Sequence, residues 1–482
     1  MTAILSVHVA LLVAGTTLFG WNLAELNAPQ KAIQGDLHLN AAQFGLASSI
    51  LAIGGLLGSI ITTPGMNALG RKKILVIAAM FFTIGGILKA AAGGPVALTA
   101  GRFLSGIGAG SAAVVVPIYI NELAPPSSRG AFGSLTQISI NFGILSSQVM
   151  GIFLEEEGQW RLILLVGAVV GCVQGVGLLF LAESPASLAA SGNLEQARRE
   201  LIKIRGTTDV EEELAGYQIP QAAGICLFSK DTNVEWLGNT EGTETERADG
   251  VEPLIAAEAG QSAGTEDTQA VDENTPLVED GTTTNPASNQ IGLLEFVTKR
   301  QFRLGFMIVA GLMLAQQLTG INAVVFYGVS ILEDLFPNSA KYLNAAISAV
   351  NLLVTLGASF LFDTMSHTTL LLRSILMMAC SSALLAVGIW FKLATLSAIS
   401  TLSFVSGFSM GLGPLPWMVA SQRIEPNGVG AAQSSALIAN WIGTFVVSFA
   451  VPVIAHAAGM HAVFISFAIL GAAFYWWGFY YL

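Results

Sequence analysis

Long apolar stretches separated by short polar segments run along most of this 482-residue chain. Each stretch is about 20 residues long, the length that a helix needs to cross a hydrocarbon core of ~30 Å. Backbone in lipid must satisfy its own hydrogen bonds, and the alternating pattern of membrane strands is absent. The pattern therefore predicts twelve membrane-spanning helices, with approximate limits 5–26, 43–63, 74–93, 97–120, 131–153, 161–182, 304–327, 342–362, 369–390, 394–420, 430–452 and 460–481.

The pattern changes between the sixth and the seventh apolar stretch. Residues 231–290 hold 14 acids and one base, Arg247. Such a segment buries too little apolar surface to offset the entropy of ordering, so we predict that it is disordered. It lies within a predicted cytoplasmic linker, 191–294, that begins with short amphipathic helices. The linker separates two six-helix bundles, residues 1–190 and 295–482.

Composition supports a membrane protein and excludes several functions. Hydrophobic residues make up 53% of the chain and charged residues only 11%, against ~25% charged residues in soluble proteins. The net charge of −11 comes from the acidic segment, because the remaining residues carry 20 bases and 18 acids. So few bases exclude a nucleic-acid footprint. Scattered cysteines and histidines give no metal-ligand spacing, and catalytic constellations and phosphate-binding loops are absent. We expect no enzyme and no cofactor.

Basic residues in short loops predict the orientation of the chain. Arg71, Lys72 and Lys73 lie between the second and third spans, Arg129 between the fourth and fifth, and Arg423 between the tenth and eleventh. Loops rich in Lys and Arg stay in the cytoplasm. Both termini are therefore predicted to be cytoplasmic.

Short internal repeats relate the two predicted bundles. Three matches recur at offsets of 300 or 301 residues: Gly20 with Gly320, Ser105-Gly106 with Ser406-Gly407, and Gly130 with Gly430. Together with the six spans on each side of the linker, they predict two halves of the same topology. Repeats of this kind place a substrate site near the midplane, between the halves.

Motifs in both halves resemble those of sugar porters of the major facilitator superfamily, close in pattern to facilitative glucose transporters. The most specific is Gln316-Gln-Leu-Thr-Gly-Ile-Asn322. The others are Phe19-Gly-Trp-Asn-Leu-Ala-Glu-Leu-Asn-Ala-Pro-Gln30, Gly70-Arg-Lys-Lys73, Gly101-Arg102, Pro117-Ile-Tyr-Ile-Asn-Glu122, Arg129-Gly130, Glu183-Ser-Pro185, Gly413-Pro-Leu-Pro-Trp417 and Asn440-Trp441. The resemblance implies an all-α major facilitator fold and an alternating-access carrier for a monosaccharide, such as a hexose.

Six of the amide side chains inside the predicted spans are candidates for sugar binding, since an amide without a partner is costly there. They are Gln137, Gln316, Gln317, Asn322, Asn351 and Asn440. An amide donates and accepts hydrogen bonds, as sugar hydroxyls do. Hydrogen bonding between helices is the alternative, and it fits a lone amide such as Asn351 equally well. The adjacent pair Gln316 and Gln317, with Asn322 nearby, favours a binding site, and the resemblance implies sugar binding at these positions.

Aromatic and apolar residues complete the predicted sugar site. Trp417 and Trp441 offer ring faces for stacking on a pyranose, with packing as the alternative role. Pro414 and Pro416 break the tenth helix, so irregular backbone there must line a cavity or pack on protein. The resemblance implies that Ile140 and Ile144 form an apolar wall. On sequence alone these two are ordinary core residues.

Charged residues near the predicted helix ends form a second group. The resemblance implies that they make ion pairs that hold the halves together in the outward-facing state, with topology marking as the alternative role. The group consists of Arg71, Arg102, Glu122, Arg129 and Glu183.

Departures from the family pattern bear on coupling. Proton-coupled relatives carry Asp at the position of Asn22, and an amide carries no proton, so the resemblance favours a uniporter. Glu25 lies on the same helix face and is the alternative site of proton coupling. In the second half, Ser409 replaces an expected Glu and Ser366-His367-Thr368 replaces a basic loop. These changes leave two alternatives open, a sugar sensor with little transport and a carrier of a polyol or another small polar solute.

The linker contains a segment that resembles an acidic dileucine sorting signal. It includes Glu273, Leu277 and Val278, which predict a sorting adaptor as partner and a vacuolar or lysosomal membrane. A solvated tail, compatible with the plasma membrane, is the alternative. The other expected partners are the sugar and the lipid bilayer, without nucleic acid, and we expect a monomer.

Overall fold

The computed structural model describes residues 3–125, 129–154, 158–218, 293–333, 335–358, 365–416 and 429–482. These residues belong to one structural unit, and most of them are helical. The acidic segment 231–290, with Glu273, Leu277 and Val278, lies outside the described residues. Trp417 and the side chain of Arg129 lie outside them as well.

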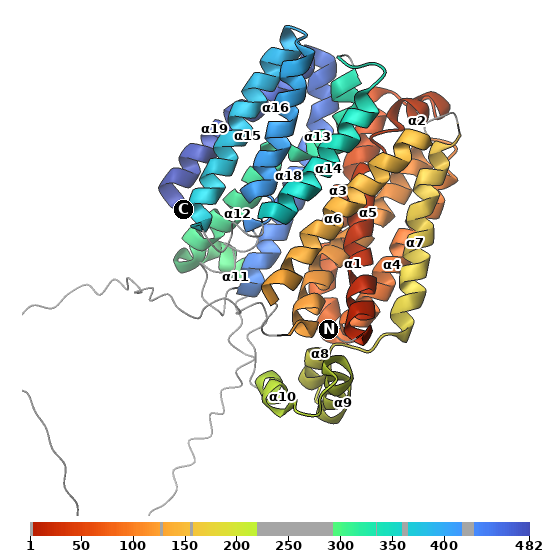
Figure 1. The fold of residues 1–482 in the computed structure, drawn as a ribbon, viewed down its shortest axis with the longest axis vertical. Coiled ribbons are helices and arrows are strands. Elements are labelled where there is room, and N and C mark those ends of the chain that lie inside the picture. The colour runs from red at the N-terminus through yellow and green to blue at the C-terminus, as the bar shows by residue number, and fades with distance from the viewer. Residues whose placement is uncertain are drawn as a thin grey trace, which may run out of the picture. The chain divides into compact units, whose positions relative to one another are not determined.

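Long helices run side by side in the N-terminal half, with α2 at one end and α8, α9 and α10 at the other (Figure 1). The helices of this half are α1 (Ala3–Ala24), α2 (Gln30–Asp36), α3 (Ala41–Leu69), α4 (Arg71–Ala90), α5 (Pro95–Leu123), α6 (Arg129–Phe153), α7 (Trp160–Phe180), α8 (Pro185–Ala190), α9 (Leu194–Arg205) and α10 (Glu211–Gln218). We call the two ends of the bundle the α2 end and the α8 end.

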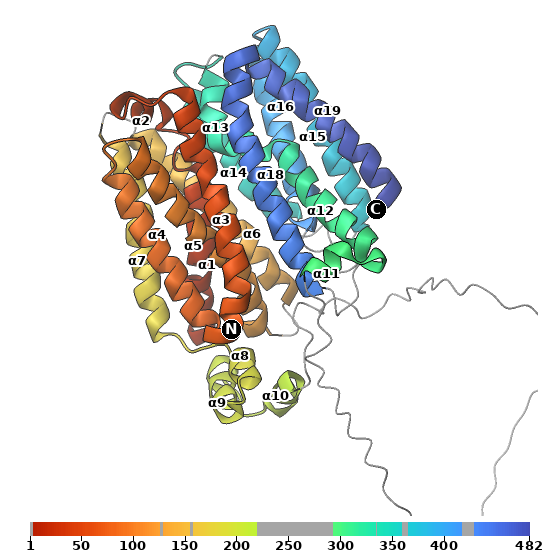
Figure 2. The ribbon, with the colours of Figure 1, turned by 180° about the vertical axis from the view of Figure 1, so that it is seen from behind.

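The C-terminal half packs beside it (Figure 2). Its elements are α11 (Leu293–Thr298), the 3₁₀ turn η3 (Arg300–Phe302), α12 (Arg303–Leu318), α13 (Ile321–Glu333), α14 (Ala340–Ala358), α15 (His367–Trp390), α16 (Ala394–Gly407), the π-helical segment η4 (Phe408–Leu412), α18 (Val429–Ala458) and α19 (Met460–Tyr481). Spans of this half are interrupted between α12 and α13 and after η4.

Local sequence explains where several of these helices begin and end. Asn40 caps α3, because its side chain accepts from the Gln43 N–H at 2.8 Å and the Gln43 side chain accepts from the Asn40 N–H. Gly70, with φ of 88°, separates α3 from α4 in a conformation that favours glycine. Pro95 opens α5, where its missing N–H has no helical partner to lose.

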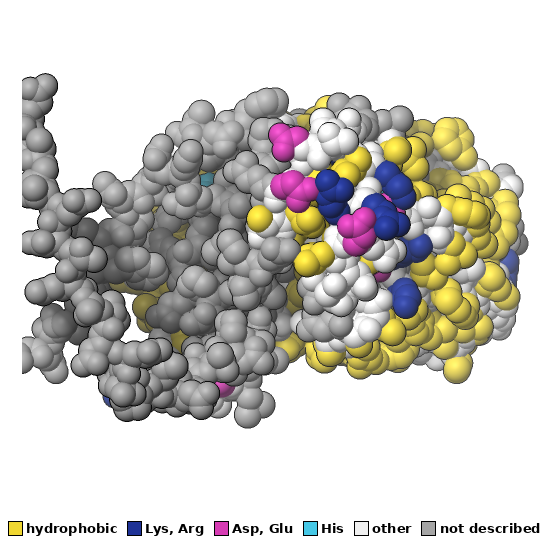
Figure 3. All heavy atoms as spheres, turned by 90° about the horizontal axis from the view of Figure 1, so that it is seen from below, with side chains coloured by type: hydrophobic (Ala, Val, Ile, Leu, Met, Phe, Trp, Pro, Cys, Tyr) yellow, Lys and Arg dark blue, Asp and Glu magenta, His cyan; other side chains and the backbone are white. Residues whose placement is uncertain are grey.

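Ten segments of the described residues are long and apolar enough to cross a membrane. The two predicted spans outside this set correspond to α6 and α14, which carry amide and hydroxyl side chains at their buried positions. Apolar side chains such as Val173, Phe180 and Ile469 are exposed on the outer surface. Figure 3 shows apolar flanks around a charged face at the α8 end. Such a surface suits lipid on the flanks and water at the end.

The charged face at the α8 end is built by α9 and α10. Arg198 bonds to Glu211 at 2.6 Å, and Arg205 bonds to Glu213 at 2.6 Å and to the Leu123 carbonyl at 2.7 Å. Burial raises the pKa of the Tyr217 phenol above its usual value, and Glu213 adds to this shift. Tyr217 therefore stays a neutral donor to Glu213 at 2.9 Å. These contacts fasten the short helices to the end of α5.

The two halves meet along α3 and α18, α1 and α13, and α6 and α14. Close approach of α3 and α18 depends on Gly55, because a Cβ there would lie 2.6 Å from the Trp441 ring. The Trp441 indole N–H donates to Ser59 Oγ at 2.9 Å. We call this contact surface between the halves the seam.

The α2 end of the seam is closed by contacts between the halves. Asn27 Nδ2 donates to the Val325 carbonyl at 2.8 Å, and Asn27 Oδ1 accepts from the Val329 N–H at 3.0 Å. Lys31 pairs with Glu333 at 2.7 Å nearby. Asn27 therefore provides partners to α13 backbone groups across the seam.

Gly20 lies at a close approach of α1 to α6. A Cβ at Gly20 would lie 2.0 Å from the Ile140 carbonyl oxygen, whereas a Cβ at Gly35 in α2 would meet nothing within 4 Å. We expect Gly20→Ala to lower the free energy of unfolding by about 1–3 kcal/mol or more, because the helices must separate. Thermal unfolding in detergent measures this loss. Gly35→Ala is the control, and equal stability of the two variants would contradict the packing described here.

Candidate functional site

The first polar cluster lies where the seventh span is interrupted. α12 ends with Gln316, Gln317 and Leu318, and α13 begins at Ile321. Gly320 joins them with φ of 101°, a conformation that residues with a Cβ rarely adopt. The interruption brings Asn322 Nδ2 into a hydrogen bond with Gln317 Oε1. The sequence motif that carries these amides therefore forms a compact polar corner.

Gln316 connects this corner to the second interrupted span. Its Nε2 donates to the carbonyls of Leu412 at 2.9 Å and Gly413 at 2.7 Å. These carbonyls lie at the end of the π-helical segment η4, just before Pro414, where the regular helical ladder stops. Backbone groups released in this way need partners inside the protein. Gln316 supplies them and is thereby held in one orientation.

α18 completes the first cluster. Asn440 Nδ2 donates to Gln316 Oε1 at 2.6 Å, and Asn322 Nδ2 donates to Thr444 Oγ1 at 3.1 Å. Gln317 Nε2 donates to Gln316 Oε1 at 3.2 Å. Asn440 is partly exposed, and the two glutamines are buried. Four of the predicted amides thus form one network within the C-terminal half.

The second polar cluster crosses the seam between α6 and α14. Gln137 Nε2 donates to Asn141 Oδ1 at 3.2 Å. Asn141 Nδ2 donates to Asn351 Oδ1 at 3.2 Å and to Thr355 Oγ1 at 2.8 Å. Ser409 Oγ, from η4, donates to the same Asn351 oxygen at 2.7 Å. This cluster joins the N-terminal half to the C-terminal half through side chains alone.

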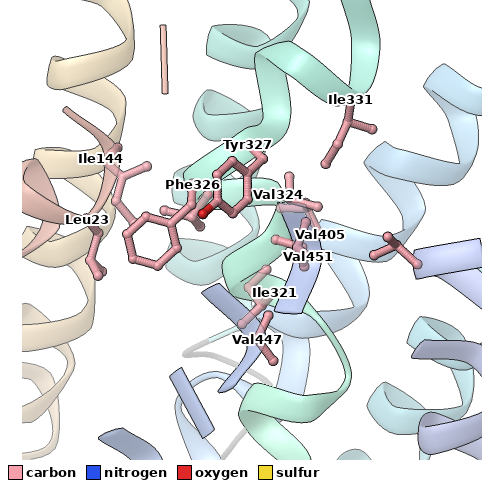
Figure 4. Packing of buried hydrophobic residues seen from close by; sticks show 14 of the residues in the cluster. Leu23, Ile144, Ile321, Val324, Phe326, Tyr327, Ile331, Val405, Val447 and Val451 are labelled. Atoms are coloured by element: carbon pink, nitrogen blue, oxygen red, sulfur yellow. The ribbon is translucent and has the colours of Figure 1, made fainter. Parts of the chain in front are cut away.

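The described apolar and aromatic residues of the predicted site are buried to different extents. Ile144 is buried beside Leu23 and Phe326 at the contact between the halves (Figure 4). Ile140 is half-buried and packs against the same cluster of apolar side chains. Trp441 is only 2% exposed, and its ring packs on Gly55 and near Phe19. In this conformation Trp441 acts as packing between α3 and α18.

Glu25 belongs to a buried ionic cluster inside the N-terminal half. Lys89 Nζ bonds to Glu25 Oε1 and, at 2.6 Å, to Asn22 Oδ1. Arg102 Nη1 lies 3.2 Å from the same Glu25 oxygen. All three charged side chains are at most 1% exposed. Arg102 is thus placed with Glu25 and apart from the other predicted ion-pair residues.

Three other residues of the predicted ion-pair group, Arg71, Glu122 and Glu183, lie at the α8 end. Arg71 donates to Glu122 Oε1 at 2.9 and 3.1 Å, and Ser184 Oγ bonds to Glu122 Oε2. Glu183 accepts from the Lys72 N–H at 3.1 Å. These partners all belong to the N-terminal half. The role of this group in holding the two halves together stays a prediction.

Several members of these clusters were not singled out from the sequence. Asn141 follows Gln137 by one helical turn, and Thr355 follows Asn351 in the same way, so an i, i+4 pattern marks both. Lys89 ends a long apolar stretch and gives no sign of its partner. Among the described residues, no group of three or more His, Cys, Asp and Glu could hold a metal ion.

Comparison with known proteins identifies the family. The sequence profile of the family described as "Sugar (and other) transporter" matches residues 7–231 and 255–482. The chain belongs to this family of sugar porters. The probable metabolite transport protein YBR241C of Saccharomyces cerevisiae is 30% identical, over 95% of this chain and 88% of the relative. The solute carrier family 2, facilitated glucose transporter member 3 of Gallus gallus is 27% identical, over 94% of this chain and 84% of the relative.

A solved structure shows the same fold. The partially occluded inward open conformation of the xylose transporter XylE from E. coli matches with a TM-score of 0.75, 20% sequence identity and 99% of both chains covered. The predicted twelve-helix major facilitator fold is therefore confirmed. This sugar porter is a multi-pass integral membrane protein, and members of its family are transporters.

The buried ionic cluster predicts a large difference between two carboxylates. Glu25→Gln should lower the free energy of unfolding by about 3–5 kcal/mol, because Lys89 and Arg102 would keep buried charges without a carboxylate. Glu333→Gln is the control, since its pair with the largely exposed Lys31 contributes only ~0–1 kcal/mol. Unfolding of purified protein in detergent compares the variants. Similar losses in both would contradict the burial of the cluster.

Proposed function

We propose that this sugar porter carries a monosaccharide, with a hexose as the expected substrate, by alternating access. The observation that carries the proposal is the pair of amide clusters at and beside the seam. Amides donate and accept in one plane, and pyranose hydroxyls require both. The amides bond to one another here, so a sugar exchanges existing hydrogen bonds for its own, which limits the cost of desolvation.

The position of the clusters suits alternating access. The second cluster joins α6 to α14 through Asn141 and Asn351, so a sugar that takes these bonds contacts both halves. Asn27 and the Lys31–Glu333 pair close the α2 end. Rocking of the halves would break these contacts and expose the clusters toward that end. Sugar binding and opening are thereby linked through the seam.

Transport without proton coupling is the form that we propose. Asn22 carries no proton, and Glu25 is paired with both Lys89 and Arg102. We further propose that the α8 end faces the cytoplasm, as Arg71, Lys72 and Lys73 indicate. A vacuolar or lysosomal membrane is proposed from Leu277 and the acidic residues before it.

A polyol is the second candidate substrate. Ser409 supports it, because this hydroxyl joins the second cluster by bonding to Asn351 at 2.7 Å. A flexible polyol could present its hydroxyls to Ser409 and Asn141 without a ring. Counterflow with a panel of hexoses and polyols in proteoliposomes separates the two candidates. Exchange of the polyols alone would replace the hexose proposal.

Gln317→Ala is expected to reduce hexose counterflow by about tenfold or more, the loss of one buried hydrogen bond of ~1.4 kcal/mol or more. Loss of the Gln317 amide would also leave the Asn322 side chain without one of its hydrogen-bond acceptors. Gln34→Ala on the surface helix α2 is the matched control and should exchange hexose at the normal rate. Thermal unfolding shows whether each variant is folded. Unchanged counterflow of a folded Gln317→Ala protein would refute the site.

A further inference from the structure

Two buried amides on neighbouring helices of the seam carry polar atoms without a partner. Gln148, in α6, is 2% exposed, and Asn344, in α14, is 1% exposed. Gln148 Oε1 and Asn344 Nδ2 make no hydrogen bond with the described residues. One atom accepts and the other donates, so together they match a hydroxyl group, which does both. We call these two residues the outer amides.

The register of the two helices brings the outer amides to the same level of the seam. α6 and α14 pack against each other in opposite directions, because α6 ends and α14 begins at the α2 end (Figure 1). Asn141 of α6 bonds to Asn351 of α14 at 3.2 Å. Gln148 follows the first of these residues by seven positions, and Asn344 precedes the second by seven. Each outer amide therefore lies two turns, about 10 Å, nearer the α2 end on the same helix face.

Contacts with the chain between α1 and α2 place the outer amides independently. A Cβ at Gly328, in α13, would lie 2.1 Å from Asn344 Oδ1 and 3.4 Å from Asn27 Nδ2. One turn after the outer amide of α6, a Cβ at Gly151 would lie 2.3 Å from the Cβ of Ala28. Both outer amides therefore lie beside the segment that closes the α2 end of the seam.

A line of polar side chains leads from the outer amides to the second polar cluster. On α14 it consists of Asn344, Ser348 and Asn351, which are buried and spaced four and three residues apart, on one helix face. On α6, Ile144 lies between Asn141 and Gln148, at the contact between the halves (Figure 4). A sugar that moves along this line meets amides at both ends and an apolar side chain between them.

Hydrogen bonding between helices does not account for the outer amides. Asn141 shows what that role requires, since it donates across the seam to Asn351 and to Thr355. Gln148 Oε1 and Asn344 Nδ2 lie on the same two helices and make no such bond. A buried polar atom without a partner disfavours folding. Polar groups kept in a membrane protein at that cost are typical of a substrate pathway.

We propose that Gln148 and Asn344 form an outer sugar-binding position, where one hydroxyl of the substrate donates to Gln148 Oε1 and accepts from Asn344 Nδ2. The inference rests on the proposed function and adds two specificity-determining residues to it. The sugar occupies this position once the halves part at the α2 end, before it reaches the two polar clusters. Parting of the halves opens the position because Asn27, which bonds to α13 at that end, lies beside it.

The experiment measures hexose counterflow by the full chain in proteoliposomes. Gln148→Leu, Asn344→Leu and the double variant remove the polar atoms while the side chains keep a similar volume. Gln174→Leu is the matched control. Gln174 also has a buried oxygen without a partner, but it lies in α7 and bonds to the Leu11 carbonyl of α1, within the N-terminal half. Monodeoxy hexoses, used as competitors of labelled hexose, report which sugar hydroxyls are bound.

We expect Gln148→Leu and Asn344→Leu each to raise the half-saturating hexose concentration about tenfold, the loss of one hydrogen bond to the sugar. In the native protein one monodeoxy hexose should compete several-fold more weakly than hexose, because it lacks the hydroxyl that the outer amides bind. The double variant should bind this analogue and hexose equally, whereas Gln174→Leu should keep the native difference. A merely structural role would lower stability and leave the dependence on that hydroxyl unchanged.

Thermal unfolding in detergent shows which variants are folded. Folded Gln148→Leu and Asn344→Leu proteins with the native half-saturating concentration and the native analogue pattern would overturn the inference, and ordered water would then be the partner of both atoms. If the leucine variants do not fold, Gln148→Asn and Asn344→Ser decide by the same measurements, because they withdraw the polar group and keep the side chain polar.

The native protein separates this inference from the proposed function. Absence of saturable exchange of hexoses and polyols by the native protein would reject the proposed function, and the outer position with it. Native exchange together with unaffected variants of both outer amides would reject the outer position alone.

Discussion

A polar group inside a hydrocarbon layer must find its partner within the protein, and this constraint organises the whole molecule. The chain interrupts two of its spans, at Gly320 and after Leu412, and so releases backbone carbonyls at membrane depth. The Gln316 side chain donates hydrogen bonds to the carbonyls released at the second interruption. A side chain that binds sugar in the proposed function is therefore also one that satisfies backbone carbonyls of the interrupted span.

The same constraint separates two kinds of polarity. Charges inside the N-terminal half are paired with one another around Glu25. The seam contains neutral amides and hydroxyls, such as Asn141, Asn351 and Ser409. Neutral groups exchange partners at a lower desolvation cost than ions do. The contact between α6 and α14 is therefore built from neutral groups, whereas the ions around Glu25 bond to one another within the N-terminal half.

The positions of the spans and of the first amide cluster could be predicted because they depend on short-range patterns. Apolar runs gave most of the helices, Pro414 and Pro416 marked the interrupted tenth span, and the motif from Gln316 to Asn322 placed three amides within two turns. The partners of those amides could not be predicted in the same way. Thr444 meets Asn322 across 122 residues of sequence, and Asn141 meets Asn351 across 210. No periodicity connects positions so far apart.

The sequence by itself determined that the chain spans the membrane in two similar halves and that amides are concentrated in the proposed sugar site. Composition and periodicity carry this information, because each residue that faces the hydrocarbon layer must be apolar whatever its distant neighbours are. Only the tertiary structure decided which polar groups meet. It placed Trp441 on Gly55 as packing, grouped Arg102 with Glu25, and brought Lys89 from the end of α4 to the same carboxylate. The partners of a buried carboxylate come from other helices, and those partners are set by how the helices pack.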